Sequence, residues 1–270
     1  MKSSITFLLF FVAFFHVHAA KVDTIEVHSA RMQKNIKTVV VSPDDGKATA
    51  TLYILHGYSG NYKNWVDNAP QIKLLVDQYQ YLVVCPDGGF DSWYWDTTDP
   101  AYQYETFIIK ELLPYIEKTY AVKADRLHRG ITGLSMGGHG ALYLAFRHQD
   151  IFAFAGSTAG GVDIRPFPNN WNMKKHLGAY HENPEAWDNH TVIELTHLIQ
   201  PGNLQLFIDC GTDDFFFEVN NKLHEKLTYL NVPHHYLTMP GRHDWKYWAR
   251  SIDFQMDFFH QCFTQVFNAK

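Results

Sequence analysis

The sequence predicts an α/β fold, in which one domain is built on a central sheet of about eight mostly parallel strands flanked by helices. Three observations favour this class. Apolar runs of strand length alternate with segments of helical periodicity through most of the chain, as a doubly wound sheet requires. Apolar residues make up 46% of the 270 residues, which is enough for one large core. No internal repeat or low-complexity segment interrupts the pattern.

The strands are expected in the following order. The first two, at residues 24–28 and 37–42, are predicted to be antiparallel and joined by a short polar stretch at 32–35. The others are the apolar runs at 51–55, 81–85, 130–134, 153–157, 204–209 and 235–239. Helical spacing predicts helices at 66–78, 102–120, 136–147, 217–230 and 245–259. The last helix has one apolar face, including Trp245 and Trp248, which we interpret as core packing.

One segment breaks this alternation. Residues 160–202 contain prolines at positions 166, 168, 184 and 201 together with several Asn, Trp and His residues, and the segment is too long for a plain connection. We therefore predict a single domain over residues 21–270 that carries a small cap-like insertion at about 160–202.

The N-terminus has the pattern of a secretory signal peptide. Lys2 precedes an apolar run at 5–15, and Val17-His18-Ala19-Ala20 offers small residues for cleavage. An uncleaved anchor is the alternative, but the apolar run is short for a spanning helix. We expect residues 1–20 to be removed, no stable membrane insertion afterwards, and a secreted or periplasmic protein that is not a lipoprotein.

Charge and cysteine content exclude several other classes. The net charge of −5 is spread without basic runs, so no nucleic-acid partner is predicted. Cys85 and Cys210 each close an apolar run and are expected to be buried on strands that are not neighbours, which makes a disulfide between them unexpected. The histidine pairs lack a convincing ligand set, so we predict no metal and no cofactor.

The segment Gly133-Leu134-Ser135-Met136-Gly137 lies between a predicted strand and a predicted helix. This is the context that a Gly-x-Ser-x-Gly nucleophile elbow requires, in which a sharp turn exposes the serine hydroxyl at a helix N-terminus. A glycine-rich turn without chemistry is the alternative interpretation. The partners of Ser135 must decide between the two.

A serine hydroxyl needs a histidine base, and the base needs an acid that fixes its tautomer. Of sixteen histidines, His243 lies between the final strand and the final helix, where a loop residue can reach the serine. Asp209, Asp213 and Asp214 compete for the role of acid after the preceding strand. Asp209 is still on the strand, and Asp213 is expected to face solvent or cap a helix, so Asp214 is the better placed.

An oxyanion formed by attack of Ser135 needs two backbone N–H donors. The amide of Met136, directly after the nucleophile, is the first. The loop His56-Gly57-Tyr58-Ser59-Gly60 follows a predicted strand at the matching edge of the sheet, and we assign its Tyr58 amide as the second. His56 is expected to order this loop rather than to transfer protons.

Four motifs together resemble the "Putative esterase" family of α/β-hydrolases, which includes feruloyl and acetyl xylan esterases, tributyrin-type esterases, S-formylglutathione hydrolase and secreted mycolyltransferases. These motifs are the loop at 55–61, the elbow at 133–141, Cys210-Gly211-Thr212-Asp213-Asp214, and the segment 241–248 around His243. The resemblance covers about residues 22–263. It implies an α/β-hydrolase fold, a triad of Ser135, Asp214 and His243, and oxyanion donors at Tyr58 and Met136.

The substrate is less well defined by the sequence. Four aromatic residues after the fourth strand and one in the insertion are candidate substrate contacts: Phe90, Trp93, Tyr94, Trp95 and Trp171. Packing beneath the cap is an equally weighted interpretation of two or more of them. The expected function is a secreted serine esterase acting on small-molecule or oligosaccharide esters, for example feruloyl or acetyl esters of plant polysaccharide. The alternatives are an acyltransferase to a sugar acceptor, an S-formylglutathione or short-chain acyl ester hydrolase, a non-catalytic binding protein and a peptidase.

Overall fold

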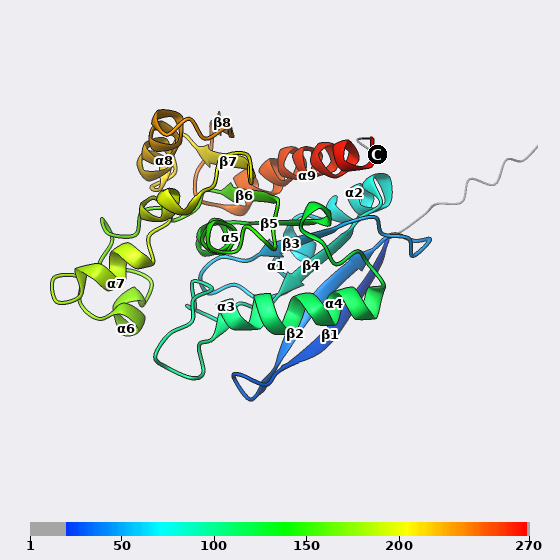
Figure 1. Ribbon diagram of the computed structural model, residues 1–270, viewed down its shortest axis with the longest axis horizontal. Coiled ribbons are helices and arrows are strands. Elements are labelled where there is room, and N and C mark those ends of the chain that lie inside the picture. The colour runs from blue at the N-terminus through cyan, green and yellow to red at the C-terminus, as the bar shows by residue number, and fades with distance from the viewer. Residues whose placement is uncertain (1–19, 269–270) are drawn as a thin grey trace, which may run out of the picture.

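The computed structural model describes residues 20–268, and these form a sheet of eight strands (Figure 1). The strand order is β1-β2-β4-β3-β5-β6-β7-β8. The β1–β2 and β2–β4 pairs are antiparallel and all other pairs are parallel, which confirms the predicted sheet. The strands are β1 (Lys21–Ser29), β2 (Lys34–Ser42), β3 (Thr51–Leu55), β4 (Leu82–Pro86), β5 (Arg129–Gly133), β6 (Phe154–Thr158), β7 (Gln205–Gly211) and β8 (His235–Met239).

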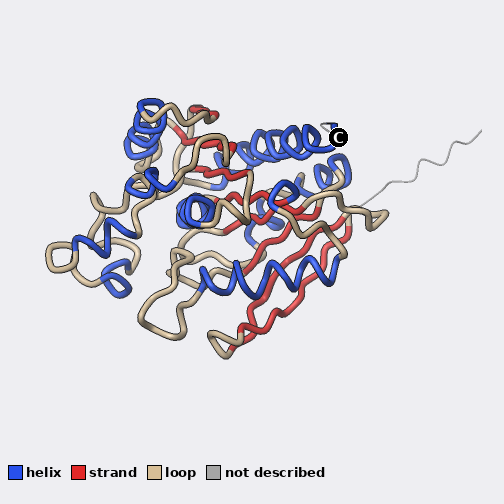
Figure 2. Tube along the Cα trace, in the orientation of Figure 1, coloured by secondary structure: helices blue, strands red, loops and turns tan. Residues whose placement is uncertain are grey.

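Helices cover both faces of the sheet, so the core is divided into two buried clusters (Figure 2). One cluster lies against α4, α5 and α8, and the other against α1, α2 and α9. The helices are α1 (Asn64–Asn68), α2 (Ile72–Tyr79), α3 (Tyr104–Thr106), α4 (Leu113–Tyr120), α5 (Met136–Arg147), α6 (Met173–Leu177), α7 (Pro184–Asn189), α8 (Phe217–Tyr229) and α9 (Trp245–Asn268), with short 3-10 turns at Arg126–His128 and Glu194–Leu198.

Two of the predicted helices differ from the structure at prolines. The helix expected at 66–78 is two helices, α1 and α2, because Pro70 cannot donate a backbone hydrogen bond and disfavours helical geometry at Ala69, whose φ and ψ are −129° and 66°. The helix expected at 102–120 begins at Tyr104 and widens into a π-helical segment, Phe107–Leu112, ahead of Pro114. The final helix continues past 259 to Asn268.

The segment at 160–202 carries α6, α7 and the turn Glu194–Leu198, and it projects from the sheet on the left of Figure 1. Its inner side joins the core through Trp187 and Val192, both fully buried. The segment leaves β6 and returns to β7, so it lies beside the strand ends that carry the predicted site.

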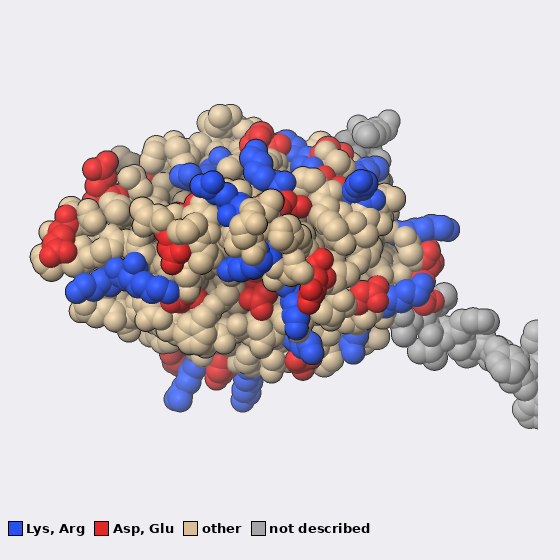
Figure 3. Space-filling view, turned by 90° about the horizontal axis from the view of Figure 1, so that it is seen from below, with Lys and Arg blue, Asp and Glu red and all other residues tan. Residues whose placement is uncertain are grey.

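The predicted signal peptide lies outside the described residues except for Ala20. Across residues 20–268, no helix has both the length and the apolar content needed to cross a bilayer. All three cysteines are buried and free, which confirms that Cys85 and Cys210 do not form a disulfide. Basic and acidic side chains are interspersed on the face shown in Figure 3.

Candidate active site

The turn between β5 and α5 has the geometry of a nucleophile elbow. Ser135 adopts φ 55° and ψ −118°, a strained conformation for a residue with a side chain. Its amide donates to the carbonyl of Thr158, at the end of β6. The flanking glycines are sterically required, because a Cβ at Gly137 would lie 2.3 Å from the Leu55 oxygen and one at Gly133 would lie 2.6 Å from the backbone of Gly137.

Two loops bring the predicted base and acid to Ser135. His243, after β8, has its Nε2 2.8 Å from Ser135 Oγ, and its Nδ1 lies 2.7 Å from Oδ2 of Asp214, after β7. The Asp214 side chain is fully buried, whereas that of His243 keeps 14% of its surface exposed. A buried carboxylate accepts the Nδ1 proton, and this tautomer leaves the Nε2 lone pair facing the serine hydroxyl.

The other two candidate acids lie elsewhere. Asp213 is exposed, and its amide donates to the carbonyl of Gly241. Asp209 is fully buried on β7, where its carboxyl group accepts hydrogen bonds from Ser251 and Gln255, at 2.7 Å each. Of the three carboxyl groups that compete in the sequence, the structure therefore brings only that of Asp214 to His243.

The buried carboxyl group of Asp209 makes the stability of the folded protein depend on pH. Burial raises the pKa of its carboxyl group to about 6, although hydrogen bonds from Gln255, Ser251 and Thr158 oppose this shift. An unfolded chain loses this proton near pH ~3.9. The folded state therefore binds more protons between these two values, and its stability falls as the pH rises through them.

We predict that the free energy of unfolding of the wild type, relative to Asp209→Asn, falls by about 1–3 kcal/mol between pH 4 and pH 7. Urea unfolding of both proteins across this range measures the difference. Asp209→Asn also changes the hydrogen bonds of this side chain by an amount that does not depend on pH. The two proteins are therefore compared by the slope of the free energy of unfolding against pH. Parallel curves would contradict the prediction.

The proposed oxyanion donors flank Ser135. Met136 is the first residue of α5, so its amide has no acceptor within the helix. The loop after β3 passes close to the nucleophile, since a Cβ built on Gly57 would lie 3.3 Å from the Ser135 Cβ. His56 orders this loop as expected: its Nε2 accepts the Gly88 amide at 2.7 Å, so Nδ1 carries the proton and donates to the carbonyl of Gly57.

Ser135 and His243 open into a small cavity of about 160 Å³ with aromatic walls. Engineered protein cavities of about 150 Å³ admit a benzene ring, so the space accommodates a short acyl chain or a single ring. The lining residues are Gly57, Tyr58, Gly60, Asn64, Leu134, Ser135, Trp171, Phe215, His243, Trp245 and Trp248. Tyr58 and Trp171 were expected here.

Sequence reasoning missed three of the aromatic walls. Trp245 and Trp248 pack with the second buried cluster, as the predicted apolar face requires, and both also line the cavity. The Trp248 ring centroid lies 4.9 Å from that of His243. Phe215, which directly follows Asp214, lies with its ring centroid 4.3 Å from His243. The signal that could have identified these three residues is their closeness in sequence to Asp214 and His243.

Three of the predicted substrate contacts are wrong. Trp93, Tyr94 and Trp95 are at most 1% exposed and pack inward against α5 and the loop after β3. The Trp95 indole donates to His139 Nε2 at 2.9 Å, and the Tyr94 hydroxyl donates to the carbonyl of His56 at 3.0 Å. Trp93 and Tyr94 both have left-handed backbones. Phe90, by contrast, is 55% exposed.

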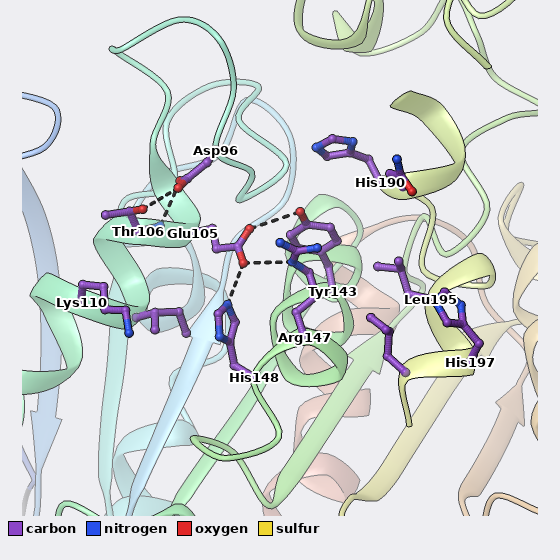
Figure 4. A pocket seen from close by; sticks show the side chains of 13 residues that line it. Asp96, Glu105, Thr106, Lys110, Tyr143, Arg147, His148, His190, Leu195 and His197 are labelled. Carbon is purple, nitrogen blue, oxygen red and sulfur yellow. Dashed lines mark hydrogen bonds and ion pairs between the residues drawn. The ribbon is translucent and has the colours of Figure 1, made fainter. Parts of the chain in front are cut away.

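A second cavity of about 520 Å³ lies at the far end of α5, between α3 and the insertion (Figure 4). Its buried carboxylate, Glu105, accepts hydrogen bonds from the Tyr143 hydroxyl, Arg147 Nε and His148 Nε2 at 2.6–3.2 Å. Burial opposes ionisation of Glu105, but these bonds and the neighbouring positive charges together lower its pKa. The cluster joins α3 to α5 and is separate from the lining of the Ser135 cavity.

Within the described chain, no group of three or more His, Cys, Asp or Glu side chains is arranged to hold a metal ion. A hydroxyl within hydrogen-bond distance of a histidine base is suited to acyl transfer.

Comparisons with known proteins identify the family and the fold. A sequence model of the family described as "Putative esterase" matches residues 29–258. An acetyl esterase of Caldicellulosiruptor saccharolyticus is 27% identical over 251 residues, covering 84% of this chain and 94% of the relative. A diacylglycerol acyltransferase/mycolyltransferase Ag85A of Mycobacterium gordonae is 36% identical over 152 residues, but this match covers 53% of this chain and 43% of the relative. The solved structure of a ferulic acid esterase has a TM-score of 0.78 and 27% identity, covering 91% and 99% of the two chains.

Proposed function

The chain belongs to the "Putative esterase" family of α/β-hydrolases, which makes it a carboxylic ester hydrolase, and from that premise we propose that it is a secreted serine esterase acting through an acyl-serine intermediate. The observation that carries the proposal is the continuous line of hydrogen bonds from Asp214 through His243 to Ser135, at 2.7 and 2.8 Å. Export rests on the signal-peptide pattern of residues 1–20.

The proposed reaction has two halves. In the first, His243 Nε2 takes the hydroxyl proton while Ser135 Oγ attacks the ester carbonyl, and the amides of Tyr58 and Met136 stabilise the oxyanion. Collapse of the tetrahedral intermediate breaks the bond to the alcohol, which leaves with the proton held by His243. In the second half, His243 takes a proton from water while the water oxygen attacks the acyl carbonyl. Collapse of the second tetrahedral intermediate breaks the bond between the acyl group and Ser135 Oγ, the carboxylic acid leaves, and Ser135 Oγ recovers a proton from His243.

We propose feruloyl or acetyl esters on plant polysaccharide as substrates. The size of the Ser135 cavity suits a small acyl group or one ring, and its aromatic walls suit stacking. Phe90 and Phe215, which are 55% and 51% exposed, extend the aromatic surface toward solvent, where a sugar chain would lie. The similar proteins named as acetyl esterase and ferulic acid esterase support the same choice.

Acyl transfer to a sugar hydroxyl is the second candidate. The acyltransferase relative favours it, because its 36% identity exceeds that of the two esterases, although over a shorter segment. Both activities share the acyl-serine and differ only in whether water or a hydroxyl attacks it. Product analysis with excess sugar acceptor separates them, since a dominant transester product would overturn hydrolysis.

A substrate panel tests the proposed function. We expect kcat/KM to be higher on methyl ferulate or acetylated xylan than on S-formylglutathione, because the cavity walls are aromatic rather than cationic. Short p-nitrophenyl esters report the common acyl-serine chemistry, and Ser135→Ala supplies the background rate. Preference for S-formylglutathione would contradict the proposed substrate class, and no turnover of any ester would contradict the proposal as a whole.

A further inference from the structure

Trp171 holds an unusual position at the catalytic cavity. It is the one lining residue that the inserted segment 160–202 contributes, and its ring stacks on Phe215 with centroids 5.7 Å apart. Phe215 in turn contacts the ring of His243. Trp171 and the following Asn172 both have left-handed backbones, with φ of 49° and 58°. Asn tolerates this conformation readily but Trp does not, so surrounding contacts must hold Trp171 in place.

Two side chains bind this turn by hydrogen bonds. The Trp93 indole donates to the carbonyl of Trp171 at 3.4 Å, and Asp91, on the loop after β4, binds Asn172. Asp91 is 3% exposed, and its Oδ2 accepts a hydrogen bond from Asn172 Nδ2 at 3.0 Å. The ammonium group of Lys175 lies 3.7 Å from the same oxygen, and Nε2 of His176 lies 3.6 Å from Oδ1. One buried carboxylate therefore faces three side chains from the first turns after Trp171.

The loop that carries Asp91 also touches the proposed oxyanion loop. The carbonyl of Phe90 accepts the amide of Ser59 at 2.8 Å, and the Phe90 ring packs edge to face on Tyr58 with centroids 4.9 Å apart. The pair Phe90–Asp91 thus bridges the two sides of the catalytic cavity. Its backbone holds the oxyanion loop, and the carboxylate of Asp91 holds the inserted segment.

The carboxylate is ionised in this arrangement. Burial opposes its ionisation, but hydrogen bonds from Asn172 and Tyr102, together with the charges of His176 and Lys175, lower the pKa of Asp91 overall. Burial also lowers the pKa of His176, against the attraction of Asp91. Asp91 is therefore available as a charged acceptor at neutral pH, where hydrogen bonds to a carboxylate are stronger than neutral ones.

We propose that Asp91 is a positioning residue, which holds Trp171 at the mouth of the catalytic cavity and thereby sets the affinity for esters whose aromatic group reaches that mouth. The inference rests on the proposed ester hydrolysis and adds a determinant of its selectivity. Asp91 does not touch the reacting atoms, and the effect assigned to it here is the one that it exerts by holding Trp171.

A double-mutant cycle tests this route directly. Asp91→Ala, Trp171→Ala and the double variant are assayed on p-nitrophenyl acetate and ethyl acetate, which form the same acetyl-enzyme but differ in the ring. We expect each single variant to lower kcat/KM for p-nitrophenyl acetate by about tenfold relative to ethyl acetate. In the Trp171→Ala background, Asp91→Ala should have no further effect on this ratio.

Additive effects of the two substitutions would overturn the proposal, because they would mean that Asp91 acts without Trp171. Asp188→Ala is the matched control: it removes another carboxylate of the inserted segment, bound to Arg165 at 3.0 Å, and should leave the ratio unchanged. If Asp91→Ala does not fold, Asn172→Ala removes the other partner of the same hydrogen bond, at an exposed position. It must then lower the kcat/KM ratio in the wild type and have no further effect in the Trp171→Ala background. Absence of wild-type turnover would instead refute the proposed function.

Discussion

Replacement of Ser135 by alanine is expected to lower turnover of p-nitrophenyl acetate by about 10⁴- to 10⁶-fold. Ser135 Oγ is the hydroxyl that lies 2.8 Å from His243 Nε2, and the acyl-serine cannot form without this oxygen. Alanine inherits the same φ of 55°, so the elbow keeps its strain and the fold is expected to persist.

The measurement is kcat/KM with the variant and wild type compared by circular dichroism and thermal unfolding. Matching unfolding temperatures assign the loss to chemistry rather than to folding. Residual activity within about 100-fold of the wild type, in a folded variant free of wild-type protein, would contradict nucleophilic catalysis by Ser135.

Asp214→Asn is expected to lower kcat by about 10⁴-fold. The reason lies in how the carboxylate is held. Oδ1 of Asp214 accepts the amide of Phe216 at 2.8 Å, and Oδ2 faces His243 Nδ1. An asparagine keeps its oxygen toward the Phe216 amide and turns its NH₂ group toward Nδ1. His243 must then carry its proton on Nε2, where it can no longer accept the proton of Ser135.

Asp213→Asn is the matched control for this substitution. The two residues are adjacent, but Asp213 is exposed and its described backbone contact is to Gly241, not to His243. Activity of the control variant should stay within about threefold of the wild type. The opposite ranking of the two variants would assign the acid to Asp213.

Much of the fold is readable from local pattern. The inner strands β3 to β6 are buried along their whole length, whereas the edge strands β1 and β8 are largely exposed or half-buried. All eight strands lie within a few residues of their predicted positions. Helix continuity was less predictable, because a single residue decides it. The apolar spacing of 66–78 is helical on both sides of Pro70, and only the missing amide and the geometry of Ala69 divide the segment.

The position of the candidate site was predictable because topology, not propensity, determines it. Ser135, Asp214 and His243 each follow a parallel strand, and parallel strands end at one edge of the sheet. The glycine motifs around Gly57 and Gly137 also indicated where two backbone segments lie too close together to leave room for a side chain. The choice of Asp214 over Asp209 followed from the distance past the end of the strand.

The aromatic residues were harder to assign, since sequence says little about where a loop points its rings. Trp93, Tyr94 and Trp95 are buried in a turn where two of them adopt left-handed backbones, and His139 accepts a hydrogen bond from the Trp95 indole. No composition rule predicts either fact. Trp248 shows the converse, as a residue on an apolar helical stripe whose position at the first turn places it beside His243.

Nucleophilic catalysis by Ser135 is tested most directly by covalent labelling of the wild type with a fluorophosphonate probe, followed by mass spectrometry of the tryptic peptides. The reagent reacts with a serine only when a base and oxyanion donors activate it. We expect one adduct, on Ser135, with loss of esterase activity in proportion to labelling and no adduct in Ser135→Ala. An active enzyme that remains unlabelled at Ser135, or that is inactivated by an adduct on another serine, would contradict nucleophilic catalysis by Ser135.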